Sequence, residues 1–239
     1  MQRSFRAFYG TMRETVVKTH FHRCNTIKPL RRQSRGLCHR IYKNFPMHSG
    51  EEENEVIIGV DHGNAQIKTK NTCFVSGLEE FPTKPPMASD VIAYQGRYWT
   101  LVGKRLPVMR DKTRDDRFYL LTLFAIAKEL EARREVASTL DIDLAVGLPP
   151  EHYGTLKESF AQYFRRQEPV RFIYNDKPFS LMLDHVFVYP QAFGAVVHRA
   201  QEMTSISRTF VIDIGGYTSD VLLLRKGKPD MEFCRSLNM

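Results

Sequence analysis

Short blocks of apolar residues alternate with turn residues over the stretch 55–110, and this pattern predicts strands rather than helices. The β-branched run 56–60 predicts a buried strand. Turn residues follow at 61–64, and an extended pattern resumes at 66–68. A hairpin is expected within 91–102, where two apolar runs flank a Gln-Gly pair. This part of the chain is therefore expected to consist of short strands.

From residue 110 onward, predicted helices alternate with predicted strands. Helical spacing of apolar residues predicts a helix over 115–134 with one core-facing stripe, formed by Leu120, Leu123, Phe124, Ala127 and Leu130. Further helices are expected at 151–164 and 191–203, and strands at 142–147, 172–174, 179–183, 186–189, 210–214 and 221–224. This alternation predicts an α/β layered fold, in which the inserted hairpins make the sheet mixed.

Two strand–turn–strand units carry an Asp at the end of the first strand. One begins at Asp61 and the other at Asp213, so they lie 152 positions apart and indicate two pseudo-equivalent lobes. Gly in each turn lets backbone N–H groups approach a ligand closely and form an anion site. Lys68 on the returning strand can reach the same anion. The carboxylates would instead hold the waters around a Mg²⁺ ion, which prefers oxygen ligands.

These units resemble the phosphate loops of the actin-like ATPase superfamily, which also includes heat-shock chaperone ATPases and sugar kinases. The segments 121–130 and 144–150 are most similar to the ParM/StbA plasmid-segregation proteins and their archaeal relatives. The resemblance covers about 55–239. It implies an actin-like (ribonuclease H-like) α/β lobe with a mixed sheet flanked by helices, followed by the first hairpin of a second, similar lobe.

The resemblance also implies roles for individual residues around ATP and Mg²⁺. Asp61 and Asp213 would support the hydration shell of Mg²⁺, Lys68 would contact the β- and γ-phosphates, and Gln191 would orient the attacking water. The two phosphate loops would be lined by Gly63, Asn64, Gly215, Gly216 and Thr218. Taken alone, Gln191 is equally consistent with an ordinary residue at a helix start.

Two neighbouring residues receive different interpretations. His62 is expected to fill the turn rather than to act on phosphate. The role of Asp220 is left open between capping its turn, pairing on the surface and acting in the site.

Composition and charge change the picture at one end only. The 239 residues are 42% hydrophobic and 26% charged, which excludes a wholly disordered chain, and no long uncharged apolar run indicates a membrane span. Four Cys without close pairing are typical of a reducing cytoplasm. Residues 1–50 hold 11 of the 35 Lys and Arg and one of the 27 Asp and Glu, so the net charge of +8 divides into +10 there and −2 elsewhere.

The basic stretch 1–54 is expected to be an extension without regular structure. Three interpretations remain open for it: an arm that binds nucleic acid, an organellar transit segment, or translated upstream sequence with the natural start at Met47, which we favour. His and Cys residues in this stretch lack zinc-ligand spacing. The first lobe is expected at 55–205, with a small hairpin-containing subdomain at about 78–110, and the incomplete second lobe at 206–239.

The chain stops 26 residues after Asp213, before any Gly-rich adenosine-binding segment. We therefore expect a fragment or truncated form that binds ATP weakly and hydrolyses it negligibly. Its terminal hairpin should be poorly anchored or packed against the first lobe, because an isolated hairpin is marginally stable. The segment 231–237 is expected to begin a strand with little left to pair with.

Three functions compete. The favoured one is an ATP-dependent, filament-forming actin-like protein that segregates plasmid or other DNA through a DNA-binding adaptor protein. The second is a sugar or acetate kinase of the same superfamily. The third is a non-enzymatic binding module whose basic arm contacts nucleic acid.

Overall fold

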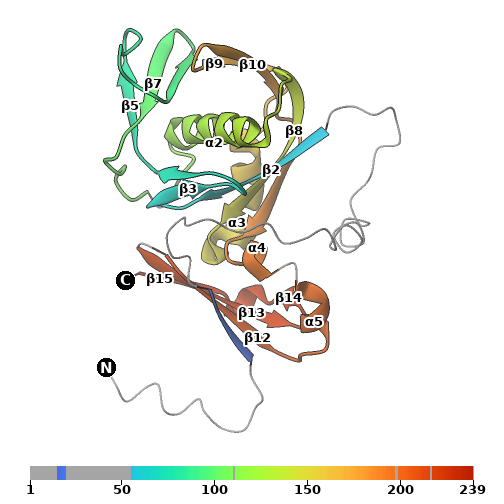
Figure 1. The fold of residues 1–239 in the computed structure, drawn as a ribbon. Helices are drawn as coiled ribbons and strands as arrows, with labels where there is room; N and C mark the ends of the chain where they lie inside the picture. The colour runs from blue at the N-terminus through green and yellow to red at the C-terminus, as the bar shows by residue number, and fades with distance from the viewer. Residues whose placement is uncertain (1–14, 20–54, 110, 197–198, 216, 239) are drawn as a thin grey trace.

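The computed structural model describes residues 15–19, 55–109, 111–196, 199–215 and 217–238 (Figure 1). The helical elements are α2 (Arg117–Arg133), α3 (Pro150–Phe164), α4 (Phe193–Val196), α5 (Ala200–Thr204) and the 3-10 helix η4 (Met231–Phe233). The strands are β1 (Thr15–Thr19), β2 (Glu55–His62), β3 (Gln66–Lys68), β4 (Cys73–Val75), β5 (Leu78–Phe81), β6 (Val91–Tyr94), β7 (Arg97–Leu101), β8 (Thr139–Leu148), β9 (Val170–Tyr174), β10 (Lys177–Met182), β11 (Val186–Pro190), β12 (Thr209–Ile214), β13 (Thr218–Arg225), β14 (Lys228–Pro229) and β15 (Arg235–Asn238).

The larger sheet is mixed and has ten strands, nine of them in the order β4-β3-β2-β8-β10-β9-β6-β7-β5 and the tenth, β11, paired with β8. The long strand β8 pairs in parallel with β2 on one edge. On its other edge it pairs with β10 through its first residues and with β11 through its last ones. The outer strands form antiparallel hairpins, including the one predicted within 91–102. The mixed sheet predicted from the sequence is confirmed.

Helix α2 is enclosed by this sheet, which curves around it from β2 and β3 to β5 and β7 (Figure 1). Twelve of its residues are buried, from Phe118 to Leu130, and they cover most of the helix circumference. The prediction of a single core-facing stripe was therefore too narrow. A flat sheet covers one face of a helix, whereas a curved one also buries the flanks.

A buried carboxylate on α2 fixes the segment that follows β3. Glu129 is fully buried and accepts hydrogen bonds from Thr69 Oγ1 at 2.6 Å, Asn71 N at 2.9 Å and Asn71 Nδ2 at 2.7 Å. Arg133 Nε donates to it at 2.8 Å. Burial raises the pKa of Glu129, but these hydrogen bonds outweigh burial and leave its pKa below the ordinary value. The network thereby anchors β3, which carries Lys68.

The second sheet contains β12, β13, β14 and β15 together with β1. β1, from the extension that was expected to lack regular structure, pairs in parallel with β12. Its sequence is short and rich in β-branched residues, so no sustained alternation marks it. The rest of the extension, including the His and Cys residues considered for zinc, lies outside the described residues.

The chain end is integrated into this second sheet. The segment expected to be a strand over 231–237 forms η4 and then β15, and β15 pairs with β13. The expectation that it would find little to pair with was wrong. Helix α3 packs on β8 and β11 of the first sheet and also contacts β13, β15 and η4, so it joins the two sheets. The terminal hairpin, for which poor anchoring and packing were the alternatives, is packed through the contact of α3 with β13.

The helix expected over 191–203 begins later than predicted. Gln191 and Ala192 form a turn, α4 begins at Phe193, and α5 follows residues 197–198, which are not described. Within the described part of the chain, no helix combines the length and apolarity needed to cross a bilayer.

Candidate functional site

The two predicted strand–turn–strand units have the same register. Asp61 pairs with Lys68 across β2 and β3, and Asp213 pairs with Asp220 across β12 and β13. The loops 63–66 and 215–218 therefore have equal lengths. Position by position, Asp220 in the second hairpin corresponds to Lys68 in the first.

Each loop needs glycine at the same position. A Cβ on Gly63 would lie 2.6 Å from the backbone oxygen of Gln66, and one on Gly215 would lie 2.9 Å from that of Thr218. Gly215 N also donates a hydrogen bond to Thr218 O at 2.8 Å. The glycines thus allow both turns to close tightly. Gly216, the other predicted loop glycine, lies outside the described residues.

The first turn is held from beneath by side chains that sequence analysis did not identify. Buried Ser76 donates from Oγ to the carbonyl oxygen of Gly63 at 2.7 Å. Buried Lys112 donates from Nζ to the carbonyl oxygen of His62. Neither residue belongs to a recognisable motif, because each acts on a backbone atom far away in the sequence.

His62, which was predicted to fill the turn, is the last residue of β2 and points into the core instead. It is fully buried, its ring stacks on Phe164 with centroids 5.0 Å apart, and Phe118 and Phe160 contact it edge-on. Burial, and secondarily the charge of Lys112, lower its pKa to about 3. The imidazole is therefore neutral, and its side chain is directed into the core.

The strand-end carboxylates of the two hairpins share one electrostatic environment. Burial raises the pKa of Asp213 first, followed by the charges of Asp61 and Asp220, while Lys68 lowers it. Burial likewise raises the pKa of Asp220, to which Ser236 Oγ donates at 2.5 Å. The charge of Asp61 on the first hairpin therefore adds to the raised pKa of Asp213 on the second.

Lys68 and Gln191 complete this cluster around Asp61. Lys68 Nζ lies 3.8 Å from Asp61 Oδ2, and Gln191 Nε2 lies 3.4 Å from Asp61 Oδ1. Gln191 is positioned by its backbone N–H, which donates to Leu148 O at 2.8 Å. Its side chain passes over Gly147, where a Cβ would lie 3.0 Å from Gln191 Cγ. The ends of the paired strands β8 and β11 thus place Gln191 beside Asp61 at the end of β2.

Asn64 and the carboxylates define what the site can hold. The Oδ1 atom of Asn64 is buried without a hydrogen-bond partner among the described residues. No group of three or more His, Cys, Asp or Glu side chains in the described ranges is arranged to bind a metal directly.

The turn that carries Gln191 contains a strained residue, and relieving the strain is expected to stabilise the chain. Ala192 has a φ of 67°, which favours glycine. We expect Ala192→Gly to raise the free energy of unfolding by about 0.5 to 1 kcal/mol in denaturant titration. Ala161→Gly, inside α3, should lower it by about 1 kcal/mol. If Ala192→Gly were less stable than the wild type, the backbone at Ala192 would not be strained.

Comparisons with known proteins were consistent with this geometry. No curated protein sequence matched the chain. The solved structure of the AlfA filament bound to AMPPNP has 18% identity and a TM-score of 0.58, covering 77% of this chain and 70% of AlfA. Apo psk41 ParM gives 14% identity and a TM-score of 0.62, with 78% and 67% of the two chains covered. The archaeal actin homologue Ta0583 in complex with ADP has 17% identity and a TM-score of 0.62, covering 77% of this chain and 61% of Ta0583.

These structures share the fold of the chain, in agreement with the actin-like fold expected from its phosphate loops. Residues 59–194, more than half of the chain, match the model of the N-terminal domain of actin-like proteins. This range contains the first hairpin, α2 and Gln191. The chain therefore belongs to the family of actin-like proteins.

Proposed function

We propose that the two hairpins form a cleft that binds Mg²⁺-ATP, and that the protein is a nucleotide-dependent, filament-forming actin-like protein of the ParM type. The observation that supports this most strongly is the shared register of the two hairpins, which places Asp61 and Asp213 at equivalent strand ends, where the charge of Asp61 adds to the raised pKa of Asp213. Gln191 reaches Asp61 from a third element. The AlfA and Ta0583 structures hold AMPPNP and ADP, which supports a nucleotide as the ligand.

The residues present fit a magnesium–triphosphate group. The turns at Gly63 and Gly215 are tight enough to require glycine, and Lys68 supplies a positive charge beside Asp61 for an anion. Asp61 and Asp213 would hold metal-bound waters, and Gln191 would orient the attacking water. When bound, Mg²⁺ offsets the negative charge of phosphates and carboxylates together. Positioning and electrostatics would then support a slow hydrolysis.

We extend the proposal to the assembly of copies of this chain into filaments and to the segregation of DNA by them. AlfA and a ParM from Clostridium botulinum were both solved as filaments, which supports a second copy of this chain as the first partner. A DNA-binding adaptor would link such a filament to its cargo. We further propose that 55–205 forms one lobe and 206–239 the start of another, with the basic extension as the only part suited to contact nucleic acid directly.

Removing either strand-end carboxylate is expected to abolish the magnesium dependence of nucleotide binding. The 239-residue chain should bind Mg²⁺-ATP in about the millimolar range, and Mg²⁺-tripolyphosphate about equally well. Asp61→Asn and Asp213→Asn should each weaken binding about tenfold with Mg²⁺, because a charged hydrogen bond to a metal-bound water is lost. Ligand-detected NMR titrations with Mg²⁺ and with EDTA measure both effects.

Asp141→Asn is the matched control, because this carboxylate is exposed at the opposite end of β8 and should not affect binding. Binding that is equally strong in EDTA, or unchanged in both cleft variants, would contradict the proposed site.

A further inference from the structure

A buried lysine lies beneath the first turn of the cleft. Lys112 is 6% exposed, and its ammonium donates a hydrogen bond to the carbonyl oxygen of His62. The ring of Phe118 lies 5.4 Å from Nζ, measured to the ring centroid. Burying an ammonium with a single hydrogen bond and an aromatic neighbour costs stability, so packing alone does not explain a lysine here.

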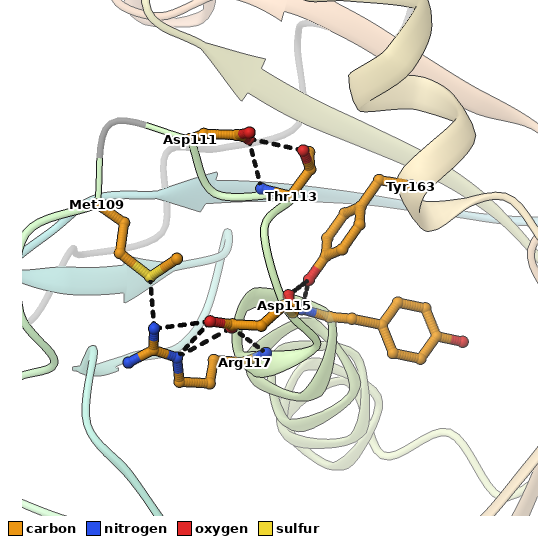
Figure 2. Close-up of polar contacts among 7 residues, drawn as sticks. Met109, Asp111, Thr113, Asp115, Arg117 and Tyr163 are labelled. Atoms are coloured by element: carbon orange, nitrogen blue, oxygen red, sulfur yellow. Dashed lines mark hydrogen bonds and ion pairs between the residues drawn. The ribbon is translucent and has the colours of Figure 1, made fainter.

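The segment around Lys112 is braced on both sides (Figure 2). Asp111 accepts hydrogen bonds from Thr113 N at 2.9 Å and Thr113 Oγ1 at 2.6 Å. Asp115 forms an ion pair with Arg117 at 2.7 Å, and its carbonyl oxygen accepts a bond from Tyr163 OH at 2.7 Å. These contacts restrict the backbone conformations open to the segment, so that Lys112 is held pointing toward the turn.

Lys112 also interacts with carboxylates of both hairpins. Burial lowers its pKa to about 8, whereas the charges of Asp61 and Asp220 raise it. Asp220 in turn faces the charges of Lys112, Asp61 and Glu151 and accepts a hydrogen bond from Ser236. Asp61 lies on β2 of the first sheet and Asp220 on β13 of the second, so the charge of Lys112 acts on one carboxylate from each sheet.

We propose that Lys112 is a positioning residue of the nucleotide cleft, which fixes the His62 carbonyl in the first turn and offsets the charge of Asp61 and Asp220. This inference rests on the proposed function. The second hairpin carries Asp220 at the position equivalent to Lys68, so the cleft lacks a positive charge there. Lys112 supplies that charge from another element. Without it, repulsion between Asp220 and the incoming phosphates would be less compensated.

The test separates this role from a structural one. Lys112→Met keeps the side-chain length and removes the charge, and Lys104→Met, at an exposed position on the preceding loop, is the control. We expect Lys112→Met to weaken Mg²⁺-ATP binding about tenfold, the scale of one charge interaction in a cleft. Its Tm without nucleotide should stay level or rise, because a buried charge has been removed. Lys104→Met should match the wild type in both measurements.

A double variant tests the charge compensation itself. Adding Asp220→Asn to Lys112→Met should restore affinity to within about threefold of wild type, since the charge that Lys112 offsets is then absent. Unchanged binding by Lys112→Met, a clearly lower Tm, or no recovery in the double variant would each overturn the inference while leaving the proposed function intact. A wild-type chain without Mg²⁺-dependent ATP binding would overturn both.

Discussion

Gly77→Ala is expected to destabilise the protein strongly. Gly77 is buried between β4 and β5, and a Cβ there would lie 2.3 Å from the backbone oxygens of both Val102 and Lys104. Because neither backbone segment can yield as a flexible side chain would, we expect the free energy of unfolding to fall by about 3 kcal/mol. Thermal unfolding should shift down by roughly 10 °C.

The same substitution is expected to affect the cleft. Gly77 directly follows Ser76, whose hydroxyl group holds the Gly63 carbonyl of the first turn. Displacing this strand end would move that support, so Mg²⁺-ATP binding should weaken as well. Gly103→Ala is a close control, because apart from its neighbours Val102 and Lys104 a Cβ there meets nothing within 4 Å. Equal stability of the two variants would contradict the crowding at Gly77.

The sequence allowed prediction of the parts of this fold that local patterns determine. Apolar runs marked β2 and β12, and the spacing of Asp, Gly and Lys indicated both turns, because loop chemistry depends on neighbouring residues. Even the equivalence of Asp61 and Asp213 was visible as a repeated local pattern. The convergence of the two turns was expected only through resemblance to known proteins.

Residues that act over long sequence distances could not be predicted in this way. Ser76 and Lys112 hold backbone carbonyl groups of the first turn, and Glu129 binds residues about 60 positions away. Such contacts follow from how the sheet curves around α2, and no periodicity encodes that curvature. The late start of α4 has a similar origin, because Gln191 is tied to β8 through Leu148 rather than to its own helix.

His62 is expected to make the stability of the protein fall as the solution becomes acidic. Thr122 Oγ1 already donates to Phe118 O at 2.7 Å, so His62 Nε2 must donate to that hydroxyl oxygen, which lies 2.7 Å away. Nδ1 is then an unprotonated, buried atom without a hydrogen-bond partner among the described residues. A second proton would place an unpaired charge inside an aromatic cage, next to Lys112, which is why the pKa falls to about 3.

The direction of the pH effect follows from proton linkage. The unfolded chain binds a proton at His62 below the ordinary pKa of 6.5, whereas the folded chain binds it only near 3, so stability is complete above pH 6.5 and declines between these values. Relative to His62→Phe, the wild type should lose about 2.5 kcal/mol between pH 7 and pH 4.5 in guanidinium titrations. His152→Phe, on the partly exposed side of α3, should instead follow the wild type. Parallel pH profiles for the wild type and His62→Phe would show that His62 is protonated in the folded protein and is not held neutral by its burial.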